Sequence, residues 1–298
     1  MNDQQKAHKR HTEHLKYSDK SSLSFEADGL SIERGSLKGY RGTSADIQLP
    51  ENLERIEEGA FYRCQHIQNI RLPAQLSYIG PYAFYGCALL SRISLPDTLT
   101  ELPNGMFWNC LALKHIDLPR ALIRIGSDVF HDCWALSELE LPDGLKEIGD
   151  CAFRTCDSLR RIRLPDSVTD IGDVAFGYCF SLESAILSGN LTQISSGAFI
   201  DCGKLTTLVL PESITAIGEA AFSGCIGLRE IIIPANVSSI GPNAFWNCES
   251  LEKVVLGAQV ESIGEGAFDY CPSLTIHAPL NSPAWTYAIQ HDIPLADI

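Results

Sequence analysis

Apolar and polar positions follow one pattern along most of this chain, and the pattern returns every 23 residues. Phenylalanine marks it without insertion or deletion, at Phe61, Phe84, Phe107, Phe130, Phe153, Phe176, Phe199, Phe222, Phe245 and Phe268. A cysteine follows three residues after each phenylalanine, from Cys64 to Cys271. Such a period indicates a solenoid, because a single unit cannot bury its own apolar face whereas stacked copies can.

Each unit can be written L-P-x-x-[LVI]-x-x-I-G-x-x-A-F-x-x-C-x-x-L-x-x-[ILV]-x-L, and nearly all of its fixed positions are apolar. The end of the unit, as in Leu159, Ile162 and Leu164, alternates with a period of two and predicts a short strand before a Pro-led turn. The segment G-x-x-A-F-x-x-C has apolar residues three apart and predicts a short helical turn. One strand in every unit predicts a coil whose strands run parallel.

This pattern resembles the BspA-type class of leucine-rich repeats, whose units carry the same P-x-x-[VL]-x-x-I-G-x-x-A-F-x-x-C-x-x-L signature. The resemblance covers about residues 50–279, in ten copies that keep one register. It implies an α/β fold: a right-handed solenoid with a parallel sheet on its concave side and short helical or irregular segments on the other. It also implies bacterial display and adhesion, since members of the class commonly bind matrix or other cells.

The ends of the chain depart from the repeat, as the terminal units of a solenoid must if they are to shield its core. Ser282 and Pro283 predict the start of a helix, because serine is favoured at the N-cap and proline at the first helical position. The pattern therefore predicts four parts: residues 1–22 as a disordered polar tail, 23–49 as an N-terminal cap, 50–279 as ten leucine-rich repeats, and 280–298 as a C-terminal cap helix and strand.

Charge and composition narrow the classes of partner. Of the 298 residues, 45% are hydrophobic and 20% are charged, which is typical of a folded soluble protein. The net charge of -14 disfavours nucleic acid and anionic membranes, because both reward clustered Lys and Arg. No stretch approaches the ~20 consecutive apolar residues of a membrane span. We therefore expect neither nucleic-acid binding nor membrane insertion.

The N-terminal segment MNDQQKAHKRHTEHLKYSDKSS lacks the apolar run that forms the centre of a secretory signal. Together with the many cysteines, this favours a cytoplasmic location, where thiols stay reduced. The family resemblance favours a cell-surface adhesin or host-contact protein instead. The sequence leaves these two locations as alternatives.

The repeat cysteines are expected to form a ladder in the core, with one strand spacing of about 4.8 Å between rungs. This separates their Cβ atoms further than the ~3.5–4.5 Å of a disulfide, and a linear ladder does not converge on one point as zinc ligands must. We therefore predict small buried thiols and neither a metal nor another cofactor. Cys151 stands outside the ladder at a variable position and is expected on the surface, with no neighbouring base to activate it.

No enzyme signature is present: the chain contains no P-loop, no G-x-G-x-x-G after a strand, no G-x-S-x-G and no H-E-x-x-H. A regular solenoid without insertions also lacks the loops on which catalytic groups usually lie. The sequence therefore predicts a non-catalytic module for protein interaction. An enzyme built on the charged half would require a defined pocket and carboxylates with shifted pKa values.

The residues that decide specificity should be the outward ones on the strands, at the fifth and seventh positions after each cysteine. In the N-terminal half they are charged and comprise Arg92, His115, Asp117, Glu138, Glu140, Arg161 and Arg163. We expect the two glutamates to face the last two arginines as a ladder of opposite charges. In the C-terminal half four seventh positions are apolar, namely Ile186, Val209, Ile232 and Val255, and they predict a stripe about 15 Å long.

Each of these groups has two interpretations. The apolar stripe is a candidate contact for a protein or peptide, or for a glycan, although β-branched residues also stabilise strands wherever they lie. The acidic residues with His115 are candidate metal ligands or acid–base groups, or members of a surface ion-pair network with the arginines. The residues after the first four repeat phenylalanines are aromatic and could form a binding platform or pack between turns; they are Tyr62, Tyr85, Trp108 and His131.

Overall fold

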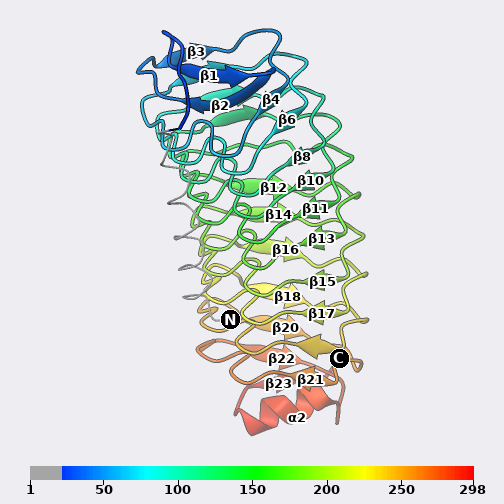
Figure 1. Cartoon of the computed structure of the whole chain (residues 1–298). Coiled ribbons are helices and arrows are strands. Elements are labelled where there is room, and N and C mark those ends of the chain that lie inside the picture. The colour runs from blue at the N-terminus through cyan, green and yellow to red at the C-terminus, as the bar shows by residue number, and fades with distance from the viewer. Residues whose placement is uncertain (1–21) are drawn as a thin grey trace.

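The computed structural model describes residues 22–298 and shows a stack of coils that follow one another in sequence order, from the N-terminal end of these residues at the top of Figure 1 to helix α2 at the bottom. Strands of successive coils pair in parallel with partners 23 residues apart, as Arg161 with Ser184 and Ser184 with Thr207. The predicted solenoid with parallel strands is therefore confirmed. Of the predicted tail, residues 1–21 lie outside the described part of the chain.

One ladder of three-residue strands forms where the sequence predicts it, at the alternating end of every unit except the one that contains residues 138–140. The central residue points into the core and its two neighbours point outward; we call the outward side chains of this ladder the strand face, which is the surface predicted as concave. The strands are β3 (Asp46–Gln48), β5 (Asn69–Arg71), β7 (Arg92–Ser94), β9 (His115–Asp117), β12 (Arg161–Arg163), β14 (Ser184–Ile186), β16 (Thr207–Val209), β18 (Glu230–Ile232), β20 (Lys253–Val255) and β22 (Thr275–His277).

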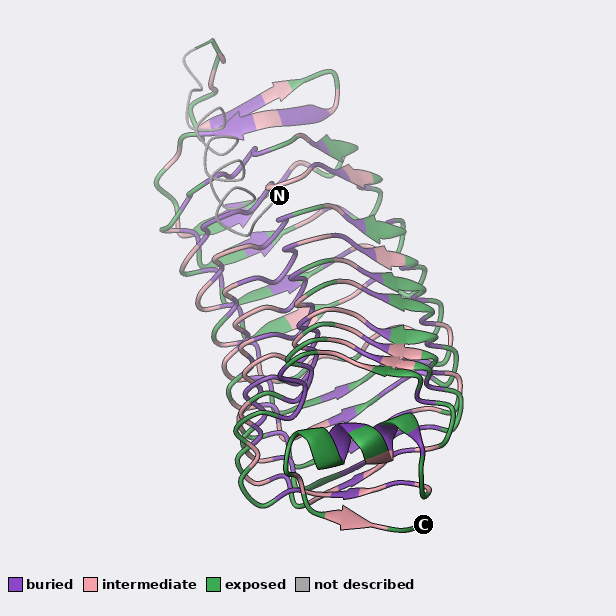
Figure 2. Cartoon of the chain, turned by 90° about the horizontal axis from the view of Figure 1, so that it is seen from below, coloured by how far each residue is buried: buried purple, intermediate pink, exposed green. Residues whose placement is uncertain are grey.

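A second ladder of two-residue strands, which the sequence did not predict, forms at the isoleucine or leucine that precedes the glycine of each unit, a position taken by Glu57, Pro103 and Ser195 in three of the repeats. Figure 2 shows the two ladders on different sides of the coil. Its members are β4 (Arg55–Ile56), β6 (Tyr78–Ile79), β8 (Glu101–Leu102), β10 (Arg124–Ile125), β11 (Glu147–Ile148), β13 (Asp170–Ile171), β15 (Gln193–Ile194), β17 (Ala216–Ile217), β19 (Ser239–Ile240) and β21 (Ser262–Ile263).

The segment predicted as a short helical turn is a stack of tight turns, and the repeats in the described residues contain no helix. Around Phe176, Val174 and Tyr178 take positive φ angles of 57° and 61°, which an α-helix does not allow. The amide of Phe176 donates to the carbonyl of Ala198 in the next coil at 2.9 Å, while the amide of Gly177 donates back to Val174 at 3.0 Å. Because successive amides alternate between the next coil and their own turn, they cannot form a helix.

The core is a continuous column of the repeat side chains, whose residues Figure 2 colours as buried. Consecutive phenylalanine rings stack with centroids 5.2–5.8 Å apart. Each ladder cysteine from Cys87 to Cys271 donates its thiol to the carbonyl of the preceding coil's phenylalanine, at 3.1–3.3 Å. Cysteine thus combines a small apolar volume with a donor that a buried carbonyl needs.

The N-terminal end begins with a hairpin. β1 (Leu30–Glu33) and β2 (Ser36–Tyr40) pair antiparallel across a turn in which Arg34 and Gly35 both have positive φ. β2 then pairs in parallel with β4, so the hairpin covers the first rung of the second ladder. Without the hairpin, the edge of the second ladder at β4 would present unpaired backbone groups.

The C-terminal end is covered by the helix α2 (Pro283–Gln290) and by β23 (Leu295–Ala296), which pairs in parallel with β22. The Ser282 hydroxyl accepts a hydrogen bond from the Trp285 amide at 3.1 Å, which caps the helix as its sequence predicts. Ala284, Tyr287 and Ala288 are the buried residues of the helix. The last coil is thereby closed on both the core and the strand side.

Candidate functional site

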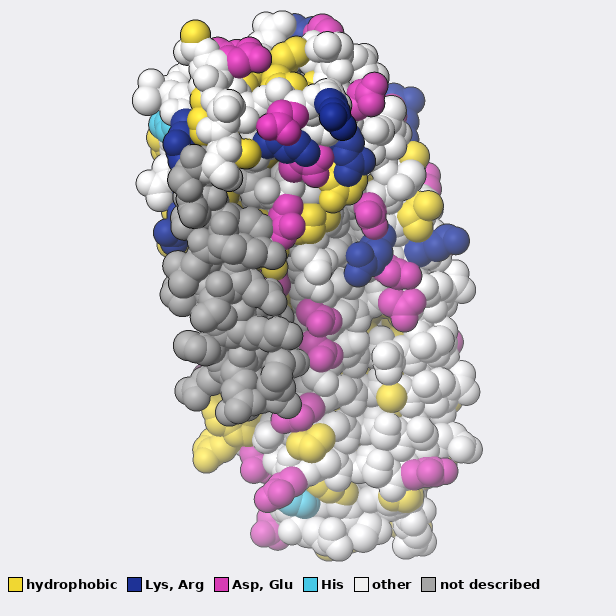
Figure 3. Space-filling view, in the orientation of Figure 1, with side chains coloured by type: hydrophobic (Ala, Val, Ile, Leu, Met, Phe, Trp, Pro, Cys, Tyr) yellow, Lys and Arg dark blue, Asp and Glu magenta, His cyan; other side chains and the backbone are white. Residues whose placement is uncertain are grey.

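The strand face carries the residues that the sequence selected. All but one of the selected side chains are exposed, namely Arg92, His115, Asp117, Glu138, Glu140, Arg161, Arg163, Ile186, Val209 and Ile232. Figure 3 shows that, on the side in view, Lys and Arg side chains gather in the N-terminal part of the solenoid, whereas Asp and Glu extend further toward the C-terminal end. On the strand face itself, the exposed residues from Arg92 to Arg163 are mostly charged, and the exposed apolar residues Ile186, Val209 and Ile232 follow them.

The apolar stripe has three exposed members and one that is half-buried. Ile186 is 55% exposed, Val209 82% and Ile232 59%. Ile186 lies in register with Val209, and Ile232 with Val255. Val255 is half-buried and lies in register with His277 on the following strand β22. The stripe thus ends one residue earlier than the sequence predicts.

The ladder of the strand face is interrupted at residues 138–140, where the repeat predicts a strand and the structure has none. β9 pairs with β7 alone, and β12 with β14 alone. Among the described residues, no backbone hydrogen bond joins 138–140 to the strand on either side. The coil between β9 and β12 is therefore present but not part of the sheet.

The sequence accounts for this interruption. Asp117 and Glu140 occupy the same position in successive coils, and like charges on neighbouring strands destabilise their pairing. Glu138 and Glu140 also place two residues of low strand propensity within one three-residue rung. Neither effect is large alone, but both act on the same short strand.

The interruption opens the core beneath it. Ile116, Leu118, Leu139 and Leu141 occupy inward positions yet are only partly buried, whereas Ile162 in the next coil is 3% exposed. A second interruption, between β16 and β18, has no such effect on its inward side chains, which remain buried. The apolar residues at 116–118 and 139–141 form the floor of a cavity of about 710 Å³.

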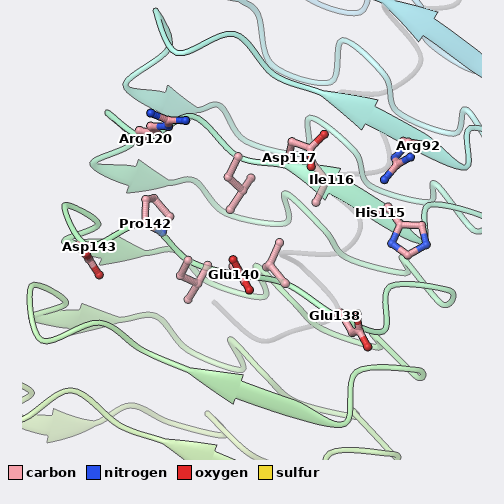
Figure 4. A pocket seen from close by; sticks show the side chains of 12 residues that line it. Arg92, His115, Ile116, Asp117, Arg120, Glu138, Glu140, Pro142 and Asp143 are labelled. Carbon is pink, nitrogen blue, oxygen red and sulfur yellow. The ribbon is translucent and has the colours of Figure 1, made fainter.

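Charged side chains surround this cavity. Figure 4 shows His115 and Asp117 on one strand, with Glu138 and Glu140 on the coil below, which is drawn without a strand arrow. Asp117 accepts a hydrogen bond from the Ser94 hydroxyl of the preceding coil. No group of His, Cys, Asp and Glu residues in the described part of the chain is arranged to hold a metal ion. The interpretation of these residues as metal ligands therefore has no geometric support.

The expected ladder of opposite charges is not formed. Neither Glu138 nor Glu140 makes an ion pair with Arg161 or Arg163 among the described residues. The physical reason is the interruption, because the register that would place these side chains opposite one another requires 138–140 to pair with β12. An ion pair between successive coils does form on the second ladder, where Arg124 Nε lies 3.2 Å from Glu147 Oε2.

The aromatic row packs between turns. The rings of Tyr62 and Tyr85 stack with centroids 4.8 Å apart, and Trp108 stacks on His131 at 4.7 Å. Burial raises the pKa of the Tyr62 and Tyr85 hydroxyls. His131 is buried as well and lies 3.0 Å from the buried carboxylate of Asp128. These contacts favour packing over a binding platform.

The cysteines form a buried ladder of thiols with no disulfide among the described residues. Burial raises the pKa of the Cys179 and Cys225 thiols to about 12, from an ordinary value near 9. Cys271, at the end of the ladder, is the one that is half-buried. The fully buried thiols of Cys179 and Cys225 are therefore protonated at neutral pH and are poor nucleophiles.

The expectation for Cys151 was wrong, because this residue is buried, with 8% of its surface exposed. It takes a left-handed conformation with φ of 54°, two residues before Phe153, and its amide donates to Asp173 of the next coil at 2.9 Å. Its variable position is therefore one of the turn positions between stacked coils. The type of residue varies at this position of the repeat, although Cys151 lies in a buried turn and not on the exposed surface.

The residues that sequence reasoning missed are the floor of the cavity. Leu139 and Leu141 keep the apolar identity of the scaffold positions, so nothing in their own type distinguishes them from buried residues of other units. The signal that could have indicated the cavity was the pair Asp117 and Glu140, because these two like charges occupy the same strand position in neighbouring coils and disfavour pairing there.

Comparisons with solved structures agree with this fold. A leucine-rich repeat protein from Bacteroides ovatus is 24% identical over 94% of this chain and 93% of its own length, with a TM-score of 0.63. A leucine-rich repeat protein from Eubacterium ventriosum is 22% identical over 85% of this chain and 76% of its own, with a TM-score of 0.51. Both similarities concern the fold alone. No curated protein matches the chain.

Two further findings bear on class. None of the helices in residues 22–298 has the length and hydropathy that crossing a membrane requires. The family model described as "BspA type Leucine rich repeat region (6 copies)" matches residues 30–160 and 146–275, which together cover most of the chain. The chain therefore belongs to the BspA-type leucine-rich repeat family.

Proposed function

We propose that this chain is a non-catalytic module that binds a protein or peptide partner on its strand face. Family membership supports an interaction function, since solenoids of this kind present extended surfaces built from variable positions on a fixed scaffold. The regular repeat, without inserted loops, supports the non-catalytic part of the proposal. Neither argument by itself selects a region of the surface.

The observation that carries the proposal is the exposed stripe of Ile186, Val209 and Ile232. Exposed apolar side chains are common singly, but three at one position of successive coils lie along one line of the strand face, which is typical of a contact surface. Charged and polar residues continue the strand face on the N-terminal side. An apolar centre with a polar surround is the usual composition of a protein interface.

The double variant Ile186→Thr with Ile232→Thr should weaken the affinity for a captured partner about tenfold or more, because each substitution replaces a buried apolar contact with a hydroxyl. Threonine keeps the β-branch, so strand propensity and fold should be preserved. The affinity would be measured by titration of the labelled chain with the purified partner, whether protein, peptide or glycan.

The matched control is Ile123→Thr, which changes an isoleucine of similar exposure (46%) beside β10 of the second ladder. It should bind the partner like the unchanged chain. Equal affinities for the double variant and the control would show that the stripe serves strand stability alone.

For location, we propose display at the bacterial surface in preference to the cytoplasm, on the basis of membership in the BspA-type family. Protease added to intact source cells should then remove the chain, as followed by an antibody, while a cytoplasmic marker persists. A chain that survives together with the marker, and that fractionates with it, would place the protein in the cytoplasm and direct the partner search there.

A further inference from the structure

The interruption at residues 138–140 leaves strand backbone without partners in the middle of the strand face. β9 is paired on the side of β7, and its other side has no backbone hydrogen bond to 138–140. A strand with an unpaired side presents N–H and C=O groups with which an extended chain can pair. Within residues 22–298, this is the one coil at which an unpaired strand side lies next to a cavity lined by inward side chains that are partly exposed.

The floor of the cavity adds an apolar contribution. Ile116 and Leu139 are inward residues of successive coils, and both are partly exposed, unlike their counterparts in the neighbouring repeats. Burying such side chains stabilises a complex in proportion to the apolar area removed from water. A ligand that covers this floor must therefore carry apolar groups as well as polar ones.

The charges around the cavity determine the sign of the ligand. Glu138 and Glu140 are exposed and make no hydrogen bond or ion pair with any described residue. Asp117 and Asp143 line the same cavity, against the two guanidinium groups of Arg92 and Arg120 and the imidazole of His115; these are all its titratable lining residues. Carboxylates exceed permanent cations there, so the field favours a cationic ligand.

We propose that this interrupted rung binds an extended peptide segment of a partner protein, with its backbone paired to β9 and its Lys or Arg side chains beside Glu138 and Glu140. This inference rests on the proposed function, from which it takes that the partner is a protein. It adds the chemistry of the bound segment: alternating basic and apolar side chains in an extended conformation, with a period of two that matches a strand.

The probe is a fluorescein-labelled peptide, Gly-Lys-Val-Lys-Val-Lys-Gly, with acetylated and amidated ends, titrated against the full chain and followed by fluorescence anisotropy. The same peptide with Glu in place of Lys should bind at least about tenfold more weakly, because it brings like charges to the cavity. Failure of the Lys peptide to bind at millimolar chain concentration, or equal binding of both peptides, would overturn the proposal.

The double variant Glu138→Gln with Glu140→Gln should weaken binding of the Lys peptide about tenfold, since it removes both unpaired carboxylates at almost unchanged volume. Glu230→Gln with Glu261→Gln removes two exposed carboxylates outside the cavity; it is the control matched in charge and should leave the affinity unchanged. An equal loss in both would indicate attraction by net charge alone and would contradict the proposed site.

Methylation of the valine amides in the Lys peptide tests strand pairing, because it removes donors without changing charge. We expect the affinity to fall at least tenfold; an unchanged affinity would exclude pairing with β9. The variant Ile186→Thr with Ile232→Thr should bind the Lys peptide normally. If the Lys peptide binds as proposed and the stripe variant keeps its full affinity for the partner, the stripe is refuted as the contact surface and this site is supported. If the stripe variant loses affinity for the partner and the Lys peptide does not bind, this site is refuted and the stripe is supported.

Discussion

Replacing Phe176 with alanine is expected to lower the free energy of unfolding by about 3–5 kcal/mol, the largest effect of any substitution proposed for this chain. The ring is fully buried and stacks between Phe153 at 5.2 Å and Phe199 at 5.5 Å. Its removal leaves a cavity in the column of stacked rings that runs through the ten repeats. Urea denaturation followed by circular dichroism measures the change.

Two control variants separate packing from other effects of losing a phenylalanine. Phe176→Leu keeps most of the apolar volume and should cost only about 1–2 kcal/mol. Phe180→Ala removes a nearby ring that is 51% exposed, and it should change stability by less than about 1 kcal/mol. Similar losses for Phe176→Ala and Phe180→Ala would contradict the central role of the stacked column.

The second large effect is expected at Gly172, where alanine should cost about 3 kcal/mol. A Cβ atom at this position would lie 2.4 Å from the backbone nitrogen of Asp150 and 2.6 Å from the carbonyl carbon of Gly149, both in the preceding coil. Since these are backbone atoms, the clash can be relieved only by separating two coils. Thermal and urea unfolding of Gly172→Ala would measure the loss.

Gly189 provides the control, because a Cβ there would meet no atom within 4 Å. Gly189→Ala should leave stability unchanged or raise it by up to about 1 kcal/mol, since alanine restricts the unfolded chain. If both alanine variants are equally stable, the spacing of the coils is not set by contact at the glycine. The two positions differ in this contact and share an ordinary backbone conformation.

The fold could be predicted because one period governs residue type along most of the chain. Phe176 and Cys179 recur in every unit, and only stacking accounts for so many apolar positions in one register. The turns could not be predicted, because apolar residues three apart fit a helical turn and a stack of tight turns equally well. The difference depends on the φ angles of Val174 and Tyr178, whose side chains do not reveal them.

The candidate site was predictable only at the level of which side chains face outward. Alternation along each strand placed Ile186 and Val209 on the surface, and they are exposed. Pairing between coils was assumed to be uniform, so Glu138 and Glu140 were expected to meet arginines in the next rung. The repeat describes an average coil, whereas the cavity depends on one coil that does not pair.

The interruptions of the two ladders also have a mechanical consequence. The strand face is unpaired around 138–140 and between β16 and β18, while the second ladder is unpaired between β6 and β8 and between β13 and β15. No two of these gaps fall in the same pair of coils, so at every gap one ladder still bridges the junction. A force that pulls the ends of the solenoid apart therefore meets backbone hydrogen bonds at each cross-section, and the molecule can contain an open binding cavity without having a plane along which it would break.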